Sequence, residues 1–128
     1  MSWPNRAEFS TLVGKTIVEI NGGVGDDRID FVCEDGDRFG MHHHQGCCEN
    51  VYLEDIDGDW EDILKSPVVV AEERTSGENP QGWSPEYSQD SFTWTFYTIR
   101  TLKGSLTMRW YGESNGYYSE DVDFERLK

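Results

Sequence analysis

Ser91-Phe92-Thr93-Trp94-Thr95-Phe96-Tyr97 is the stretch that decides the fold, because large rings and threonines alternate along it. A period of two is typical of a β-strand whose two faces differ. We predict that this strand opens an antiparallel three-stranded meander over residues 91–101, 105–111 and 117–124, with turns at Lys103-Gly104 and Asn115-Gly116. Trp94, Phe96 and Trp110 are expected to be largely buried.

The segments before the meander predict more strands and one short helix. Strands are expected over 16–20, 28–33, 38–44, 51–53 and 68–73, and the second and third of these form a hairpin. Residues 59–64 are the one helical candidate, with Asp57 or Asp59 as N-cap and Ser66-Pro67 as the stop. Residues 75–90 read as one long surface loop. The 128 residues are therefore predicted to form a single α+β domain, mainly antiparallel β, with a C-terminal meander and one short helix.

The charge balance limits the function classes. The chain has 25 Asp and Glu against 11 Lys and Arg, a net charge of −14. A phosphate backbone or an anionic membrane would repel such a protein, so direct binding to nucleic acid or to a membrane is not expected. The surface either serves solubility or acts as a decoy, whose carboxylates replace phosphates on a basic, nucleic-acid-handling partner. Without an apolar span or secretory signal, we expect a cytoplasmic protein.

A dense cluster of metal-ligating residue types lies at 41–49. On a strand, His42 and His44 share a face, and Gly46 permits a bend that brings a cysteine back towards them. Imidazole and thiolate are preferred zinc ligands, but the spacing matches no standard zinc motif. The alternatives are solvated histidines beside buried, reduced cysteines, or a nucleophilic cysteine with a histidine partner. The candidate metal ligands are His42, His44, Cys47, Cys48 and Glu49.

Two further clusters are candidates for contact with a ligand or partner. The run 55–59 resembles a calcium loop, but Trp60 stands where that loop needs glycine and Ser66 where it needs glutamate. We interpret it as a turn that caps the following helix. The run 109–120 combines a guanidinium, tyrosines and a hairpin tip, which suits an anion or a protein loop, although such residues are also ordinary strand and turn formers. The candidate binding residues are Asp55, Asp57, Asp59, Arg109, Tyr111, Asn115, Tyr117, Tyr118 and Glu120.

Several motifs together resemble those of a small uncharacterised family carried largely by bacteriophages. They are His-His-Gln-Gly-Cys-Cys-Glu at 43–49, Trp-Thr-Phe-Tyr at 94–97 and Arg-Trp-Tyr-Gly-Glu-Ser-Asn-Gly-Tyr-Tyr-Ser-Glu at 109–120. The resemblance covers about residues 40–122. It implies a phage accessory protein in the host cytosol, and it assigns no catalytic residue.

Three classes of function follow. The leading one is an accessory binding protein that inhibits a host defence or nucleic-acid-handling protein, or sequesters a small anionic signalling ligand. The second is a small zinc-dependent hydrolase or zinc-stabilised domain built on residues 42–49. The third is an assembly protein whose aromatic strands form a homo-oligomer interface. Without a standard catalytic signature, a non-enzymatic protein without a cofactor is favoured, and zinc is the one alternative.

Overall fold

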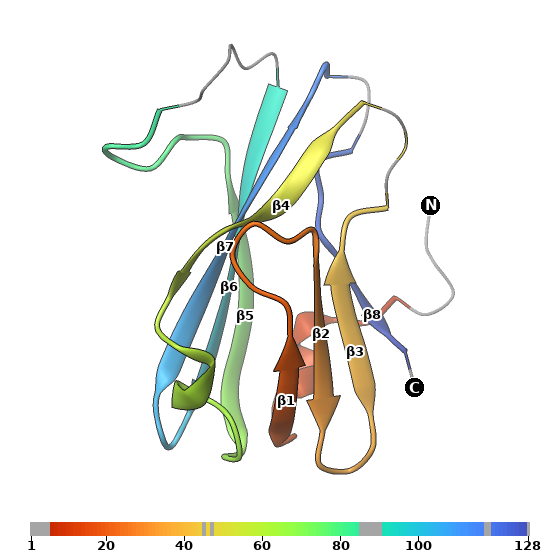
Figure 1. Cartoon of the computed structure of the whole chain (residues 1–128), viewed down its shortest axis with the longest axis vertical. Coiled ribbons are helices and arrows are strands. Elements are labelled where there is room, and N and C mark those ends of the chain that lie inside the picture. The colour runs from red at the N-terminus through yellow and green to blue at the C-terminus, as the bar shows by residue number, and fades with distance from the viewer. Residues whose placement is uncertain (1–5, 45, 47, 85–90, 117–118, 128) are drawn as a thin grey trace.

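The computed structural model describes residues 6–44, 46, 48–84, 91–116 and 119–127, and they form two antiparallel sheets. Figure 1 shows the two sheets as facing layers. The first sheet has the order β1-β2-β3-β8 and the second β4-β7-β6-β5. The strands are β1 (Ile17–Asn21), β2 (Arg28–Cys33), β3 (Arg38–His42), β4 (Asn50–Asp57), β5 (Val68–Ser76), β6 (Ser91–Thr101), β7 (Ser105–Ser114) and β8 (Asp123–Arg126).

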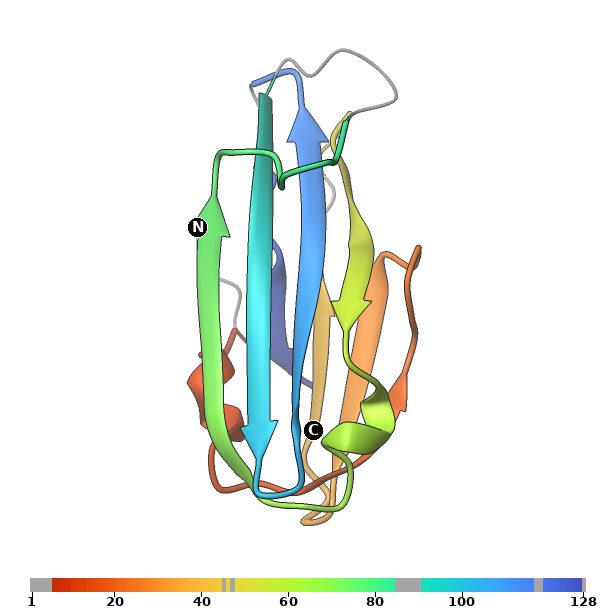
Figure 2. The same ribbon diagram turned by 90° about the vertical axis from the view of Figure 1, so that its left-hand side faces the viewer.

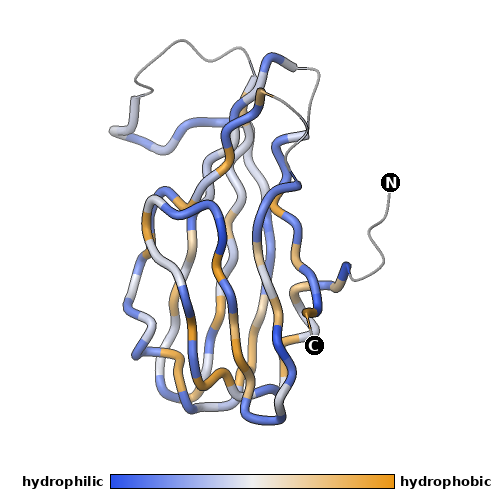
Figure 3. The backbone as a smooth tube through the Cα atoms, turned by 45° about the vertical axis from the view of Figure 1, so that its right-hand side comes forward, coloured by the Kyte–Doolittle hydropathy of each residue, from blue (hydrophilic) through white to orange (hydrophobic). Residues whose placement is uncertain are grey.

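The hydrophobic core lies between the inner faces of the two sheets. Phe39 of β3 stacks on Phe124 of β8 with ring centroids 5.1 Å apart, and Phe9 packs at 4.7 Å from Tyr97 of β6. Figure 3 shows apolar positions (orange) interleaved with hydrophilic ones (blue) along the strands. This alternation leaves each sheet with one buried face and one polar outer face.

The α+β prediction is wrong, because the structure is nearly all-β: 54% of the described residues are in strands and 6% in helical turns. Within the described ranges there are only two 3₁₀ turns, η1 (Phe9–Leu12) and η2 (Trp60–Asp62), and no helix long and apolar enough to cross a membrane. The expected helix over 59–64 shrinks to η2, since the side chains of Asp59 and Asp62 form a capping box that closes a single turn. Lys65 then turns the chain with a φ of 64°. A helix limited to residues 59–64 would form too few internal hydrogen bonds to be stable.

The predicted meander is right for its first two strands and wrong for its third. β6 and β7 pair antiparallel around a turn at Lys103-Gly104, and β2 and β3 form the expected hairpin. β7 pairs on its other side with β4, whereas β8 crosses to the first sheet and pairs with β3. This crossing buries Phe124 against Phe39 and Phe31 of the first sheet.

The burial of side chains on β6 also differs from the prediction at one position. Trp94 and Trp110 are fully buried as predicted, but Phe96 is only half-buried. The core face of β6 carries Tyr97 and Ile99, so Trp94 lies on the outer face. Trp83, from the segment after β5, covers it there with ring centroids 4.8 Å apart.

Candidate functional site

The outer face of the second sheet aligns one side chain from each strand in a cross-strand row. In register, Arg74 of β5 lies opposite Phe96 of β6, Phe96 opposite Arg109 of β7, and Arg109 opposite Asp55 of β4. Figure 2 views this face, with β5, β6, β7 and β4 side by side. Residues opposite one another on one face of a sheet are close enough to interact directly.

Both arginines of the row are fixed by specific contacts. The Arg74 guanidinium lies 4.4 Å from the centroid of the Phe96 ring, and that of Arg109 lies 5.2 Å from the Trp94 ring. Arg109 also donates from Nε to Glu54 Oε1 at 2.9 Å and from Nη2 to Glu54 Oε2 at 3.1 Å. Glu54 therefore compensates the charge of Arg109 and holds its plane in one orientation.

A hollow of about 360 Å³ lies beside this row. Asp55 and Asp57 are exposed, and they place two carboxylates at its edge. Phe96 and Thr107 supply uncharged surface between the strands. The hollow is lined by Asp55, Ile56, Asp57, Arg74, Phe96, Thr107 and Arg109.

An aromatic cluster continues the same face beyond Arg109. Trp94 packs on Tyr111 with centroids 4.7 Å apart, and Tyr111 meets Tyr52 edge-on at 6.0 Å. Trp94 Nε1 donates to Asn79 Oδ1 at 3.0 Å, which ties the segment after β5 to the sheet. The face therefore offers planar rings and guanidinium groups beside exposed carboxylates.

The structure brings together four of the predicted binding residues, namely Arg109, Tyr111, Asp55 and Asp57. Asp55 and Asp57 belong to β4 rather than to a capping turn, and Asp59 alone caps η2. The remaining candidates lie elsewhere: Asn115 is exposed after β7, Glu120 is buried, and Tyr117 and Tyr118 fall outside the described residues.

Glu120 has a structural role. Its carboxylate accepts hydrogen bonds from the hydroxyls of Thr93 at 2.8 Å and Ser114 at 2.6 Å. These bonds tie the chain after β7 back to the second sheet. Sequence reasoning missed Arg74 and Trp83, because nothing local places them on this face.

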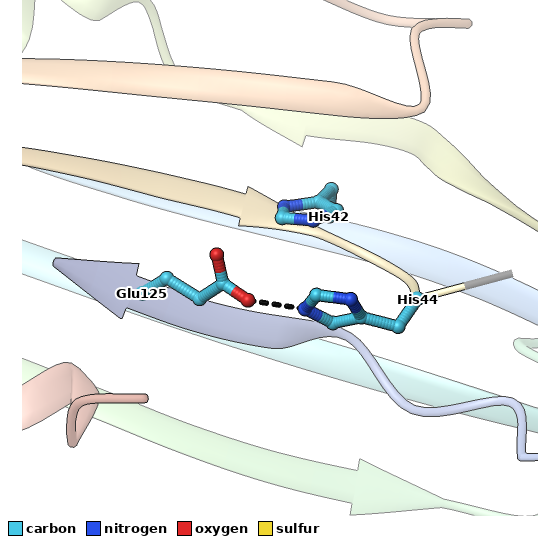
Figure 4. Close-up of side chains that lie close together, drawn as sticks. All are labelled: His42, His44 and Glu125. Carbon is cyan, nitrogen blue, oxygen red and sulfur yellow. Dashed lines mark hydrogen bonds and ion pairs between the residues drawn. The ribbon is translucent and has the colours of Figure 1, made fainter. Parts of the chain in front are cut away.

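A second cluster lies on the outer face of the first sheet, where β3 ends beside β8. His42 at the end of β3, His44 two residues beyond it and Glu125 of β8 each offer one ligand atom, and these atoms all lie within 4.8 Å of one another. In Figure 4, a dashed line joins His44 to Glu125, and His42 lies beside them. The contact joins His44 Nε2 to Glu125 Oε1, and the two imidazole rings lie 4.6 Å apart.

His42 is held in an environment that favours its neutral form. Burial lowers the pKa of His42; Glu125 and Asp123 act in the opposite direction, and Arg28 and His44 add to the lowering. Its Nδ1 is buried and has no hydrogen-bond partner among the described residues. A neutral imidazole keeps a lone pair that can bind a proton or a metal.

The other predicted metal ligands do not join this pair. Glu49 lies beside His43 instead, with its Oε2 3.2 Å from His43 Nε2. His43, which was not a predicted ligand, also has its Nδ1 2.7 Å from the carbonyl oxygen of Asp121. Cys48 is disulfide-bonded, contrary to the expectation of reduced thiols, so it offers no thiolate to a metal. Cys47 falls outside the described residues. Glu125, 81 residues from His44, is the ligand candidate that sequence reasoning missed.

The fold and these two outer-face clusters define a small acidic protein of two antiparallel sheets with polar chemistry on both exposed faces. The chain belongs to the family described as Domain of unknown function (DUF7448), which matches residues 10–124. The expectation of an uncharacterised family is thereby confirmed. No curated protein and no solved structure shows significant similarity to this chain.

Proposed function

We propose that this protein is an acidic binding protein that occupies a cationic surface of a partner protein with the outer face of its second sheet. The observation that carries the proposal is the row of Arg74, Phe96, Arg109 and Asp55, which lies beside a hollow with two exposed carboxylates. Within the described part of the chain, Figure 2 shows only the segment after β5 crossing in front of this face.

Electrostatics favour a cationic partner over an anionic one. Glu54 compensates Arg109, and Asp55, Asp57 and the neighbouring Glu72 outweigh Arg74, the other arginine of the row. A net charge of −14 adds a negative field around the whole molecule. Such a field attracts a basic surface and accelerates its association. A small anionic ligand would approach against that field, so it matches this face less well.

Planar side chains on this face can also contact a partner through packing, in addition to charge. The rings of Trp83 and Phe96 and the guanidinium of Arg74 present flat surface that a partner can cover. Aromatic side chains are enriched at protein interfaces because they bury a large area with few rotatable bonds, and arginine because its planar guanidinium stacks on rings and donates several hydrogen bonds. Charge therefore steers the encounter, and ring contacts slow dissociation.

The resemblance to a phage-carried family favours a host protein as the partner. A host protein that handles nucleic acid presents lysines and arginines to phosphates, and carboxylates spaced along a strand can occupy that surface. We therefore propose inhibition of a defence or nucleic-acid-handling protein as the biological role. No catalytic step is required for this role.

Octalysine is a suitable probe of the face, with tryptophan fluorescence in stopped flow as the readout. The double variant Asp55→Asn/Asp57→Asn removes two charges from the hollow. The matched control Glu19→Gln/Glu34→Gln removes two exposed charges, one from β1 and one from the β2–β3 turn of the other sheet. We expect the first variant to slow association by about threefold or more at low salt and the control to change it by much less. The difference should vanish at about 0.3 M salt, where the Debye length is only about 6 Å.

Two outcomes would contradict the proposal. Equal slowing by both double variants would show that only net charge matters and that the face is not a site. An association rate indifferent to salt would show that carboxylates do not steer the encounter. Circular dichroism of each variant confirms that the sheets are intact before the rates are compared.

A further inference from the structure

We infer that His42, His44 and Glu125 form a binding site for a divalent transition-metal cation of the zinc class on the outer face of the first sheet. Two imidazole nitrogens and one carboxylate oxygen are the protein ligands of many open zinc sites. The site lies on the other sheet from the proposed binding face, so it is independent of that function.

The spacing of the ligand atoms suits such a cation. Zinc bonds to nitrogen and carboxylate oxygen are about 2.0–2.2 Å long, so ligand atoms in a tetrahedral site lie roughly 3.4 Å apart. In this structure all three ligand atoms lie within 4.8 Å of one another. Side-chain rotations that move each atom by about 1 Å would complete the geometry without moving the strands.

The strands themselves hold the ligands on one face. In the β3–β8 pairing His42 lies opposite Asp123 and Gly40 opposite Glu125, so the outward side chains of both strands converge here. Gly40 has no side chain, and the side chains of Arg28, Asp30 and Leu127 pack over it, so that a Cβ there would lie within 3.0–3.2 Å of them. Two of the three ligands are partly exposed: 26% of the His44 side chain and 12% of the Glu125 side chain are accessible to solvent.

A buried nitrogen of His42 is a second, separate indication of a bound group. The part of the chain that the structure describes gives His42 Nδ1 no hydrogen-bond partner, although the atom is buried. A buried polar atom left unpaired costs about 1–3 kcal/mol, and proteins rarely retain one without a reason. A metal at the centre of the cluster would give that nitrogen a partner.

The surrounding charges support a cation. Asp123 accepts a hydrogen bond from the backbone N–H of His44 at 3.2 Å, which positions the segment that carries this imidazole. Arg28 is paired with Asp30 at 2.9 Å and Arg6 with Asp123 at 3.5 Å, so the repulsion from both arginines is compensated. A second layer of carboxylates around metal-binding histidines is a common feature of metal sites.

A metal here would fasten the last strand of the first sheet. β8 has only four residues and pairs with β3 alone among the described strands of that sheet. A bond from His42 and His44 through the cation to Glu125 would join the ends of these two strands. Because the three ligands converge only in the folded chain, metal binding would stabilise the fold. Three protein ligands also leave a fourth position for a solvent molecule.

Zinc titration of the full chain tests the inference. The protein is expressed without a histidine tag, treated with EDTA, and titrated with Zn²⁺ against a chromophoric chelator. We expect one zinc per chain and a higher melting temperature in its presence. His42→Gln and Glu125→Gln should each weaken zinc binding by about 100-fold or more, beyond the 10–100-fold typical of outer-shell changes. The control His43→Gln removes the intervening histidine and should stay within about threefold of the parent protein.

Cobalt substitution distinguishes this ligand set from one that contains cysteine. Co²⁺ bound by two imidazoles and a carboxylate gives visible ligand-field bands without a sulfur-to-cobalt charge-transfer band in the near ultraviolet. A sulfur band would overturn the assignment. So would less than about a tenth of a zinc per chain, or equal loss of binding in the His43 and His42 variants. Circular dichroism confirms the fold of each variant.

Discussion

Replacing Trp94 by alanine tests how the outer face of the second sheet is built. Trp94 is fully buried although it lies outside the core between the sheets. A buried indole removes roughly 200 Å² from water, worth about 5 kcal/mol at about 25 cal/mol per Å². The hydrogen bond from its Nε1 to Asn79 adds about 1 kcal/mol. Trp83 can settle into part of the vacated space, so we expect a loss of about 3–4 kcal/mol.

Urea unfolding and thermal melting measure this loss, and the melting temperature should fall by about 10–15 °C. A double-mutant cycle with Trp83→Ala then isolates the contact between the two rings, 4.8 Å apart. We expect a coupling energy of about 0.5–1.5 kcal/mol. A loss below about 1 kcal/mol for Trp94→Ala, or a coupling near zero, would refute the conclusion that Trp83 seals Trp94 against the sheet.

Three further predictions concern two positions away from this face. Gly112→Ala should destabilise the protein by about 2 kcal/mol or more, since an added Cβ would lie 2.6 Å from the backbone oxygen of Glu120. Gly77→Ala is the control, because an added Cβ there would have no atom of the described residues within 4 Å, and equal denaturation midpoints would contradict the argument. Burial, reinforced by Asp35, raises the pKa of Cys33 to about 11, so at pH 8 only about one thiol in a thousand is ionised. Iodoacetamide should label Cys33 at least about 100-fold more slowly in the folded than in the guanidinium-unfolded protein, as followed by peptide mass spectrometry, and equal rates would contradict this. The folded thiol keeps its proton to higher pH than the unfolded one, so the free energy of unfolding should also fall as pH rises from about 9 to about 11.

The parts of the fold that sequence predicts correctly are those fixed by local pairing. Residues 28–42 and 91–114 each form a hairpin, because alternating strands flank a short turn and the partner lies within a few residues. Local pairing does not predict which sheet the expected third strand, 117–124, joins. Asn115-Gly116 indicates a turn, and Gly116 has a φ of 94°, but a turn does not say which sheet receives the next strand. The choice depends on the burial of Phe124 against Phe39, a contact across 85 positions.

Side-chain size alone does not determine which face of β6 lies in the core. Both faces of this strand carry large rings, Trp94 and Phe96 on one and Tyr97 on the other. The core takes the face that also carries Ile99, whose aliphatic side chain continues the apolar stripe. Trp94 is buried all the same, because Trp83 folds over it from a segment that the sequence shows only as polar and rich in turns.

The proposed metal ligands also differ in how far the sequence predicts them: the two histidines are close in sequence, and Glu125 is distant. A period of two places His42 and His44 on one face and His43 on the other, and the structure keeps this arrangement. The third ligand follows from the crossing of β8, since only that pairing brings Glu125 opposite Gly40. The two histidines were therefore predictable as a pair, whereas the carboxylate depended on topology. Two histidines at this spacing near the end of a strand therefore predict a complete metal site only when the neighbouring strand is known.

The architecture explains why both candidate sites lie on outer faces. The inner faces carry a close-packed hydrophobic core in which an added polar atom would lack a partner. The outer faces keep contact with water and can hold charged groups at little cost. The core also separates the two sites, because His42 and Arg109 belong to different sheets. A cation on the first sheet would thus act on the second mainly through the stability of the whole fold, and loss of metal should leave the local geometry of the Arg109–Glu54 pair unchanged.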